Sequence, residues 1–99
     1  MPDDFDPTPP PFEPDQALQA LRRELRALGL SERDGVFERR GLAIARAAVT
    51  DQTLHAARVK RPARSGPDWI ERPLRSALDA RGFVADLKQQ LASWSDRDD

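Results

Sequence analysis

The chain has 99 residues, 38% of them hydrophobic and 33% charged, and its formal net charge at pH 7 is −1. This length fits one small domain, and the absence of cysteine excludes disulfides, thiolate catalysis and cysteine-bound zinc or iron–sulfur clusters. No apolar run approaches the roughly 18–20 residues that span a bilayer, and the start of the chain does not resemble a secretory signal, so we expect a cytoplasmic protein.

The beginning of the chain predicts a disordered, acidic arm that covers residues 1–14. Residues 1–15 hold six prolines, five acids and no base. Proline fixes φ and removes a backbone donor, so neither a helix nor a sheet is expected here. Phe12 is an apolar residue within this solvated stretch, and we expect it to contact the folded domain or a partner protein.

A first helix is predicted from Asp15 to about Leu28. Four leucines follow one another at spacings of three, four and three residues, which places them on one stripe of a helix: Leu18, Leu21, Leu25 and Leu28. Asp15 is a suitable N-cap, and Gly29 is expected to end the helix.

A second helix is predicted to begin at Ser31, because Ser31-Glu32-Arg33-Asp34 matches a capping box. Gly35 and Gly41 would weaken this helix. A short strand over Leu42–Ala45 is the alternative, and the sequence leaves the choice open. Around Thr50-Asp51 the helix either continues or restarts.

The strongest local signal is a run of cations in the middle of the chain. Residues 16–64 contain eleven bases against five acids, and the run from Arg58 to Arg64 contains four bases and no acid. Residues 60–67 are expected to form a loop because they contain two prolines and a glycine. Clustered cations are typical of nucleic-acid binding, since the phosphate backbone contributes most of the non-specific affinity. The predicted nucleic-acid-binding residues are Arg39, Arg40, Arg58, Lys60, Arg61 and Arg64.

Two further helices are predicted after this loop. Residues 65–68 resemble a capping box ahead of Trp69, and Pro73 is expected in the first turn of a third helix that ends at Gly82. A fourth helix from about Phe83 to Ser93 repeats the three, four, three spacing with Val84, Leu87, Leu91 and Trp94. Residues 95–99 are expected to be frayed.

These elements together predict an all-α fold, a small bundle of three to five short helices formed by residues 15–94 behind the N-terminal arm. The hydrophobic stripes of the helices define the expected core: Leu18, Leu21, Leu25, Leu28, Phe37, Ile44, Leu54, Leu78, Leu87 and Leu91.

The sequence contains no recognisable catalytic or metal-binding motif, so we expect no enzyme activity, no catalytic residue, no metal, no cofactor and no small-molecule substrate. His55 is the only histidine. Asp51 lies four residues before it, which favours an ordinary pair on a helix surface.

The sequence therefore predicts a small non-enzymatic binding protein whose basic middle contacts an anionic partner, most plausibly nucleic acid. The alternative is a protein-interaction adaptor or accessory subunit that docks through its leucine stripes, its proline-rich arm or the residues Phe12, Trp69 and Trp94, with a homodimer as one form of this alternative. No membrane partner is expected. The position of the arginines separates the two hypotheses, because only nucleic-acid binding needs them on one surface.

Overall fold

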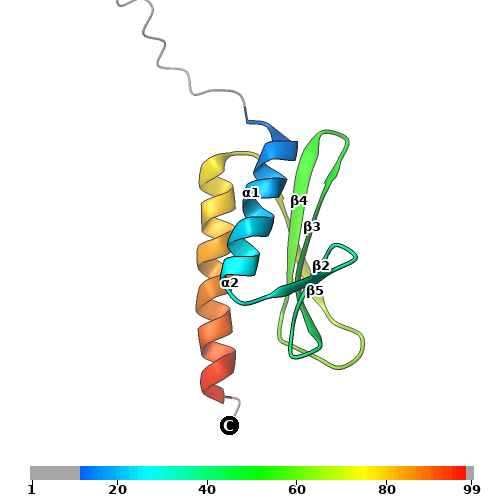
Figure 1. The fold of residues 1–99 in the computed structure, drawn as a ribbon, viewed down its shortest axis with the longest axis vertical. Coiled ribbons are helices and arrows are strands. Elements are labelled where there is room, and N and C mark those ends of the chain that lie inside the picture. The colour runs from blue at the N-terminus through cyan, green and yellow to red at the C-terminus, as the bar shows by residue number, and fades with distance from the viewer. Residues whose placement is uncertain (1–11, 98–99) are drawn as a thin grey trace, which may run out of the picture.

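The computed structural model describes residues 12–97, so the predicted arm lies mostly outside the described residues. These residues form a five-stranded antiparallel sheet with both helices on one of its faces (Figure 1). The prediction of an all-α bundle is therefore wrong. The elements in chain order are α1 (Pro14–Ala27), β1 (Ser31–Arg33), β2 (Val36–Arg39), β3 (Leu42–Thr50), β4 (Thr53–Val59), β5 (Trp69–Leu74) and α2 (Ala77–Arg97).

The sheet is a meander in which each strand pairs with the next one along the chain, in the order β1-β2-β3-β4-β5. Two-residue turns join the first four strands: Asp34-Gly35, Arg40-Gly41 and Asp51-Gln52. Both residues of each turn have a positive φ, between 51° and 80°. This is the backbone that type I′ turns require, and such turns match the twist of the strands that they connect.

The predicted helix that begins at Ser31 is wrong, because these residues form strands joined by tight turns. Gly35 and Gly41 do not weaken a helix but occupy turn positions, where a residue without Cβ adopts positive φ at no steric cost. The Ser31–Asp34 capping box is a coincidental match, since Ser31–Arg33 is a strand that pairs with β2. The alternative of a strand over Leu42–Ala45 is confirmed, because these residues begin β3.

The turn at Asp51-Gln52 contains no glycine, although Gln52 has a φ of 62°. Replacing Gln52 with glycine is expected to raise the free energy of unfolding by about 1 kcal/mol, because left-handed backbone costs other residues roughly that much. Urea unfolding followed by circular dichroism measures the change. Gly35→Ala is the opposite control and should be destabilising. An unchanged or lower midpoint for Gln52→Gly would contradict this account of the turn.

The two helices differ from the prediction mainly at their ends. The first helix is confirmed, although it begins at Pro14 and not at Asp15. The predicted fourth helix lies within α2, whereas the third helix is wrong because Pro73 and Leu74 belong to β5. Neither α1 nor α2 is long and apolar enough to cross a membrane.

Helix α2 begins with a capping box that the sequence analysis overlooked. The backbone N–H of Asp79 donates to Oγ of Ser76 at 3.0 Å, and the Asp79 carboxylate accepts from the backbone N–H of Arg75 at 2.9 Å. The first bond satisfies a backbone donor that a helix start leaves without a partner, and the second holds the residue before the Ser76 cap. They explain why α2 starts after residue 76.

The core lies between the sheet and the two helices. Most predicted core residues are buried there, but Leu78 is 74% exposed because α2 presents the stripe of Phe83, Leu87 and Leu91 to the sheet. Leu18 and Leu28 are only partly buried. The buried cluster consists of Leu21, Leu25, Leu30, Phe37, Ile44, Ala45, Leu54, Ala56, Leu74, Phe83, Leu87 and Leu91.

Candidate nucleic-acid interface

Two cation-bearing connections lie at the same end of the sheet. Arg39 pairs with Leu42 at the β2–β3 turn, and Ala45 near the start of β3 pairs with Arg58 near the end of β4. Because antiparallel neighbours run in opposite directions, the β2–β3 turn and the β4–β5 loop must be close to each other. Figure 1 shows both connections at the lower end, where α2 also ends. We call residues 39–41 and 60–68 together the basic end.

A pocket of about 310 Å³ opens at the basic end. Three arginines from the two connections line it together with an aromatic ring from α2, although these segments are far apart in the sequence. Its lining residues are Arg39, Arg40, Leu42, Ile44, Arg61, Pro62 and Trp94. The pocket thus combines cationic groups with apolar and aromatic surface, which suits a ligand that carries both negative charge and a flat ring.

The cations of the β4–β5 loop face solvent. Lys60, Arg61 and Arg64 are exposed, and Arg39 is partly exposed. Asp68 is the only acid in residues 60–68, and its backbone carbonyl accepts a 2.9 Å hydrogen bond from the backbone N–H of Lys60, which closes the base of the loop. The loop therefore presents its bases with little local compensation from carboxylates.

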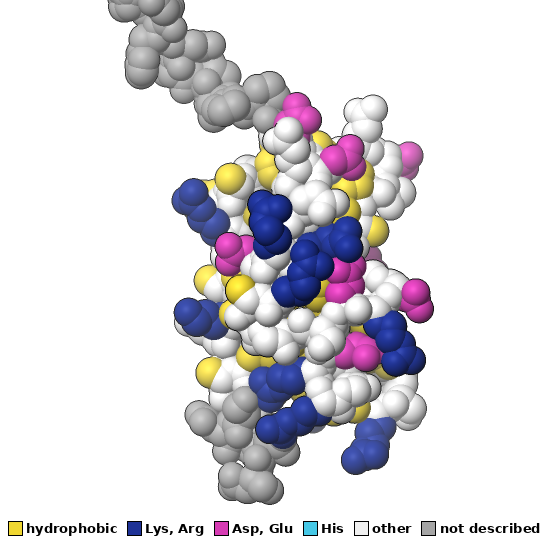
Figure 2. Space-filling view, in the orientation of Figure 1, with side chains coloured by type: hydrophobic (Ala, Val, Ile, Leu, Met, Phe, Trp, Pro, Cys, Tyr) yellow, Lys and Arg dark blue, Asp and Glu magenta, His cyan; other side chains and the backbone are white. Residues whose placement is uncertain are grey.

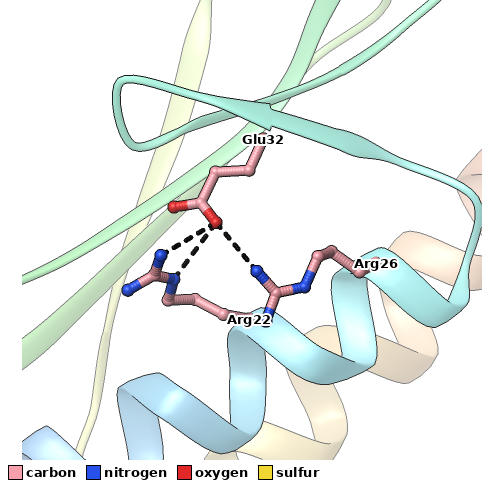
Figure 3. A network of polar contacts seen from close by, with 3 residues as sticks. All are labelled: Arg22, Arg26 and Glu32. Carbon is pink, nitrogen blue, oxygen red and sulfur yellow. Dashed lines mark hydrogen bonds and ion pairs between the residues drawn. The ribbon is translucent and has the colours of Figure 1, made fainter.

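Other arginines of the basic middle segment are paired with acids. Arg22 and Arg26 both reach from α1 to the Glu32 carboxylate on β1, with their nearest nitrogens 3.0 and 3.2 Å from Oε1 (Figure 3). The Glu32 side chain is only 17% exposed. These two arginines attach the short strand β1 to α1, and their charge is partly neutralised there.

Arg58 is also engaged inside the fold. Its Nε lies 2.6 Å from Oδ2 of Asp86 on α2, and its Nη1 donates to the backbone carbonyl of Val59 at 2.9 Å. The side chain is only 16% exposed. Arg58 therefore connects β4 to α2, and it contributes little to a surface that would contact an external anion.

Trp69 lies on the sheet face away from the helices. It pairs directly with Val59, the residue after Arg58, and successive residues of a strand point to opposite faces. The guanidinium of Arg46 lies over the Trp69 ring at 4.4 Å, and its Nη2 is 2.8 Å from Oε2 of Glu71. One face of the ring is thus already covered by a cation.

The three residues predicted to bind a partner protein do not form one site. Trp94 packs partly against the core on the helix side of the sheet, whereas Trp69 lies on the other side. Phe12 lies two residues before α1 and packs partly against the core, and α1 begins at the end of the fold opposite to the basic end (Figure 1). Of these residues, Trp94 alone lines the cationic pocket.

His55 does not lie on a helix, so its predicted helix-surface pair with Asp51 is wrong. It is an exposed residue of β4 that faces Ala48 and Pro73 on the neighbouring strands, and Asp51 lies in the turn before that strand. Among residues 12–97, no group of three histidines or acids is arranged to hold a metal ion.

Exposed acids and bases are mixed over much of the described surface, and the exposed Arg75 and Arg81 lie near the start of α2. Exposed acids lie near the start of α1 and at the β3–β4 turn, at Glu13, Asp15 and Asp51. Figure 2 shows acidic side chains at the upper end, both signs side by side over the middle, and mainly basic side chains at the lower end. The basic end carries five bases and one acid, Asp68, so an anion is attracted there.

The chain matches no protein-family model, no curated protein and no solved structure. Its function must accordingly be inferred from the arrangement of its own residues. The cations of the basic end could be recognised in the sequence. That Trp94 lines the same pocket depends on the register of the strands and on the length of α2.

Proposed function

We propose that the protein binds nucleic acid through the basic end, with a preference for single strands. The observation that carries this proposal is the pocket in which Arg39, Arg40 and Arg61 surround apolar residues and Trp94. Several cations around one pocket suit a phosphate backbone, and an aromatic ring in the same lining suits a nucleobase that has left its stack. A cytoplasmic location remains a prediction from the sequence.

The proposal favours single strands because a turn and a loop at the end of a five-stranded sheet form the basic end, with neither a helix nor a separate two-stranded ribbon. Reading a duplex in its major groove needs an element that fits the groove, most often a helix or a two-stranded ribbon. A single strand needs only a track of positive charge and a ring for stacking, and stacking contributes about 1–3 kcal/mol per base. Trp94 is the aromatic residue in the lining of the pocket and would supply this ring.

Binding and stacking can be measured separately. In a Trp69→Phe protein, fluorescence comes from Trp94, and a single-stranded oligonucleotide of about 12 nucleotides is expected to quench it. Anisotropy of the labelled oligonucleotide should show tighter binding than for a duplex of the same length. Affinity should fall steeply between about 50 and 200 mM salt.

Inorganic polyphosphate is the control ligand, because it carries phosphate charge but no nucleobases. It should bind at low salt but leave Trp94 fluorescence unchanged. A protein that binds no oligonucleotide at low salt would overturn the proposal, and equal binding of duplex and single strand without quenching would overturn the preference for single strands.

A further inference from the structure

A wide apolar groove lies between α1 and the first half of α2. Its volume is about 960 Å³, and Phe12 lines it together with Leu21 of α1 and Val84 of α2. The rest of its apolar lining is small, with Ala17 and Ala20 on α1 and Ala77, Ala80 and Ala85 on α2. The two helices run in the same direction along the sheet (Figure 1). Such small residues leave room for the backbone of another element to come close.

The two walls of this groove carry opposite charges. Glu13 and Glu24 lie on the α1 side, whereas Arg75 and Arg81 lie on the α2 side, and all four side chains are exposed. Among the described residues, no ion pair joins one wall to the other. Opposite charges that face a common groove without pairing are complementary to an occupant that carries both signs.

The length and shape of the groove suit a helix. Glu13 and Glu24 on the α1 wall are eleven positions apart, which corresponds to about 17 Å or three helical turns. A helix in a groove is held by apolar side chains at spacings of three and four residues. A third helix would lie on the floor of alanines, and its two flanks would face the charged walls.

We propose that the groove docks an amphipathic helix of a partner protein, with bases along the flank facing α1 and acids along the flank facing α2. This inference is independent of nucleic-acid binding and uses a different surface. It takes up the adaptor alternative but assigns the contact to the alanine groove, because the leucine stripes of α1 and α2 are largely occupied by the protein's own core. It also gives a function to the charged residues that the core does not use.

Designed peptides of about 16 residues provide the probes. All share one leucine and alanine stripe. The two-sign peptide has lysines along one flank and glutamates along the other, and two control peptides carry only lysine or only glutamate on both flanks. Reversing the direction of a helix exchanges its flanks, so the two-sign peptide matches the groove in one direction, whereas each control mismatches one wall in either direction.

Fluorescence anisotropy should show that the full chain binds the two-sign peptide about tenfold more tightly than either control peptide. Circular dichroism should show that the peptide becomes helical on binding. In the Arg75→Glu/Arg81→Glu variant both walls are acidic, so the all-lysine peptide should become the tightest ligand. Equal affinity for the three peptides, or no exchange of preference in this variant, would overturn the proposal.

Two matched substitutions locate the site. Ala20 lies in the groove and Ala92 lies outside it on α2, and both are exposed. Ala20→Trp should fill the groove and reduce peptide affinity at least tenfold, whereas Ala92→Trp should leave it unchanged. Retained binding in Ala20→Trp would overturn the proposal.

The same variants identify other occupants. If the purified protein sediments as a dimer that Ala20→Trp dissociates and Ala92→Trp does not, a second copy fills the groove and the partner helix is excluded. If the two-sign peptide binds only after residues 1–11 are deleted, the chain's own arm is the occupant. Either result would replace the proposal.

Discussion

Reversing two charges of the basic end, with Arg39→Glu and Arg61→Glu in one protein, is expected to weaken binding of a single-stranded oligonucleotide about 100-fold at low salt. Both side chains line the same pocket. Each substitution removes a cation that would lie near a phosphate and places a carboxylate there, so attraction is replaced by repulsion. The slope of log K against log salt should become flatter by about 1 to 2, because fewer counterions are released.

The matched control for this effect is Arg23→Glu with Arg81→Glu. It changes the net charge by the same amount, but both residues are exposed on the helices, away from the basic end. A second test pair, Arg61→Glu with Arg64→Glu, alters only exposed loop residues. A loss of binding in this pair would therefore not be explained by a loss of folding. Equal losses in the control and in the test pairs would mean that net charge alone governs binding, and the basic end would lose its assigned function.

The largest effect on stability is expected for Phe37→Ala, which should lower the free energy of unfolding by about 3–5 kcal/mol. Phe37 is 1% exposed and belongs to the cluster between the sheet and the helices. Truncation removes its buried ring and leaves a cavity that the neighbouring β-strand and helices cannot fully close. A domain of this size has a total stability of about 5–10 kcal/mol, so the variant should be partly unfolded at 37 °C.

Leu78→Ala is the control for Phe37→Ala, and urea unfolding measures both. Leu78 is 74% exposed in the sheet-and-helix fold, so its truncation should change stability by less than about 0.5 kcal/mol. In the all-α bundle expected from the sequence, Leu78 would be a core residue and the loss would be several times larger. The pair of variants thus tests the fold itself, and comparable losses would contradict the structure.

The helices could be recognised from the sequence because each has a regular apolar stripe. The three, four, three spacing from Leu18 to Leu28 and from Val84 to Trp94 is a helical period, and both segments are helical in the structure. The spacing of the apolar residues does not indicate which element each stripe packs against. They face the sheet, and for this reason correct helices led to a wrong fold class.

The strands were missed for two physical reasons. β3 contains alanine at positions 43, 45, 47 and 48, and alanine favours helices and hides the alternation of apolar and polar residues. The turn at Asp51-Gln52 lacks the glycine that usually marks a type I′ hairpin. Asp34-Gly35 is such a hairpin signal, but the prediction followed the capping-box match at Ser31–Asp34 and did not use it.

The candidate sites were recognisable only in part. The cation run identified Lys60, Arg61 and Arg64 as exposed loop residues. It could not show that Arg58 pairs with Asp86, because this pair depends on which face of β4 Arg58 occupies. Arg39 and Arg61 line the same pocket, and this depends on the register of the strands. The groove between the helices arises from tertiary packing, and no local pattern in the sequence predicts it.

The open order of the meander also leaves two strands with an unpaired side, and both are poor templates for another chain. β1 has three residues, which offer few backbone groups to a neighbour. β5 carries Pro73, which has no N–H and is tolerated on such an outer strand. Among the described residues, both outer strands therefore offer little backbone for edge-to-edge pairing with another chain.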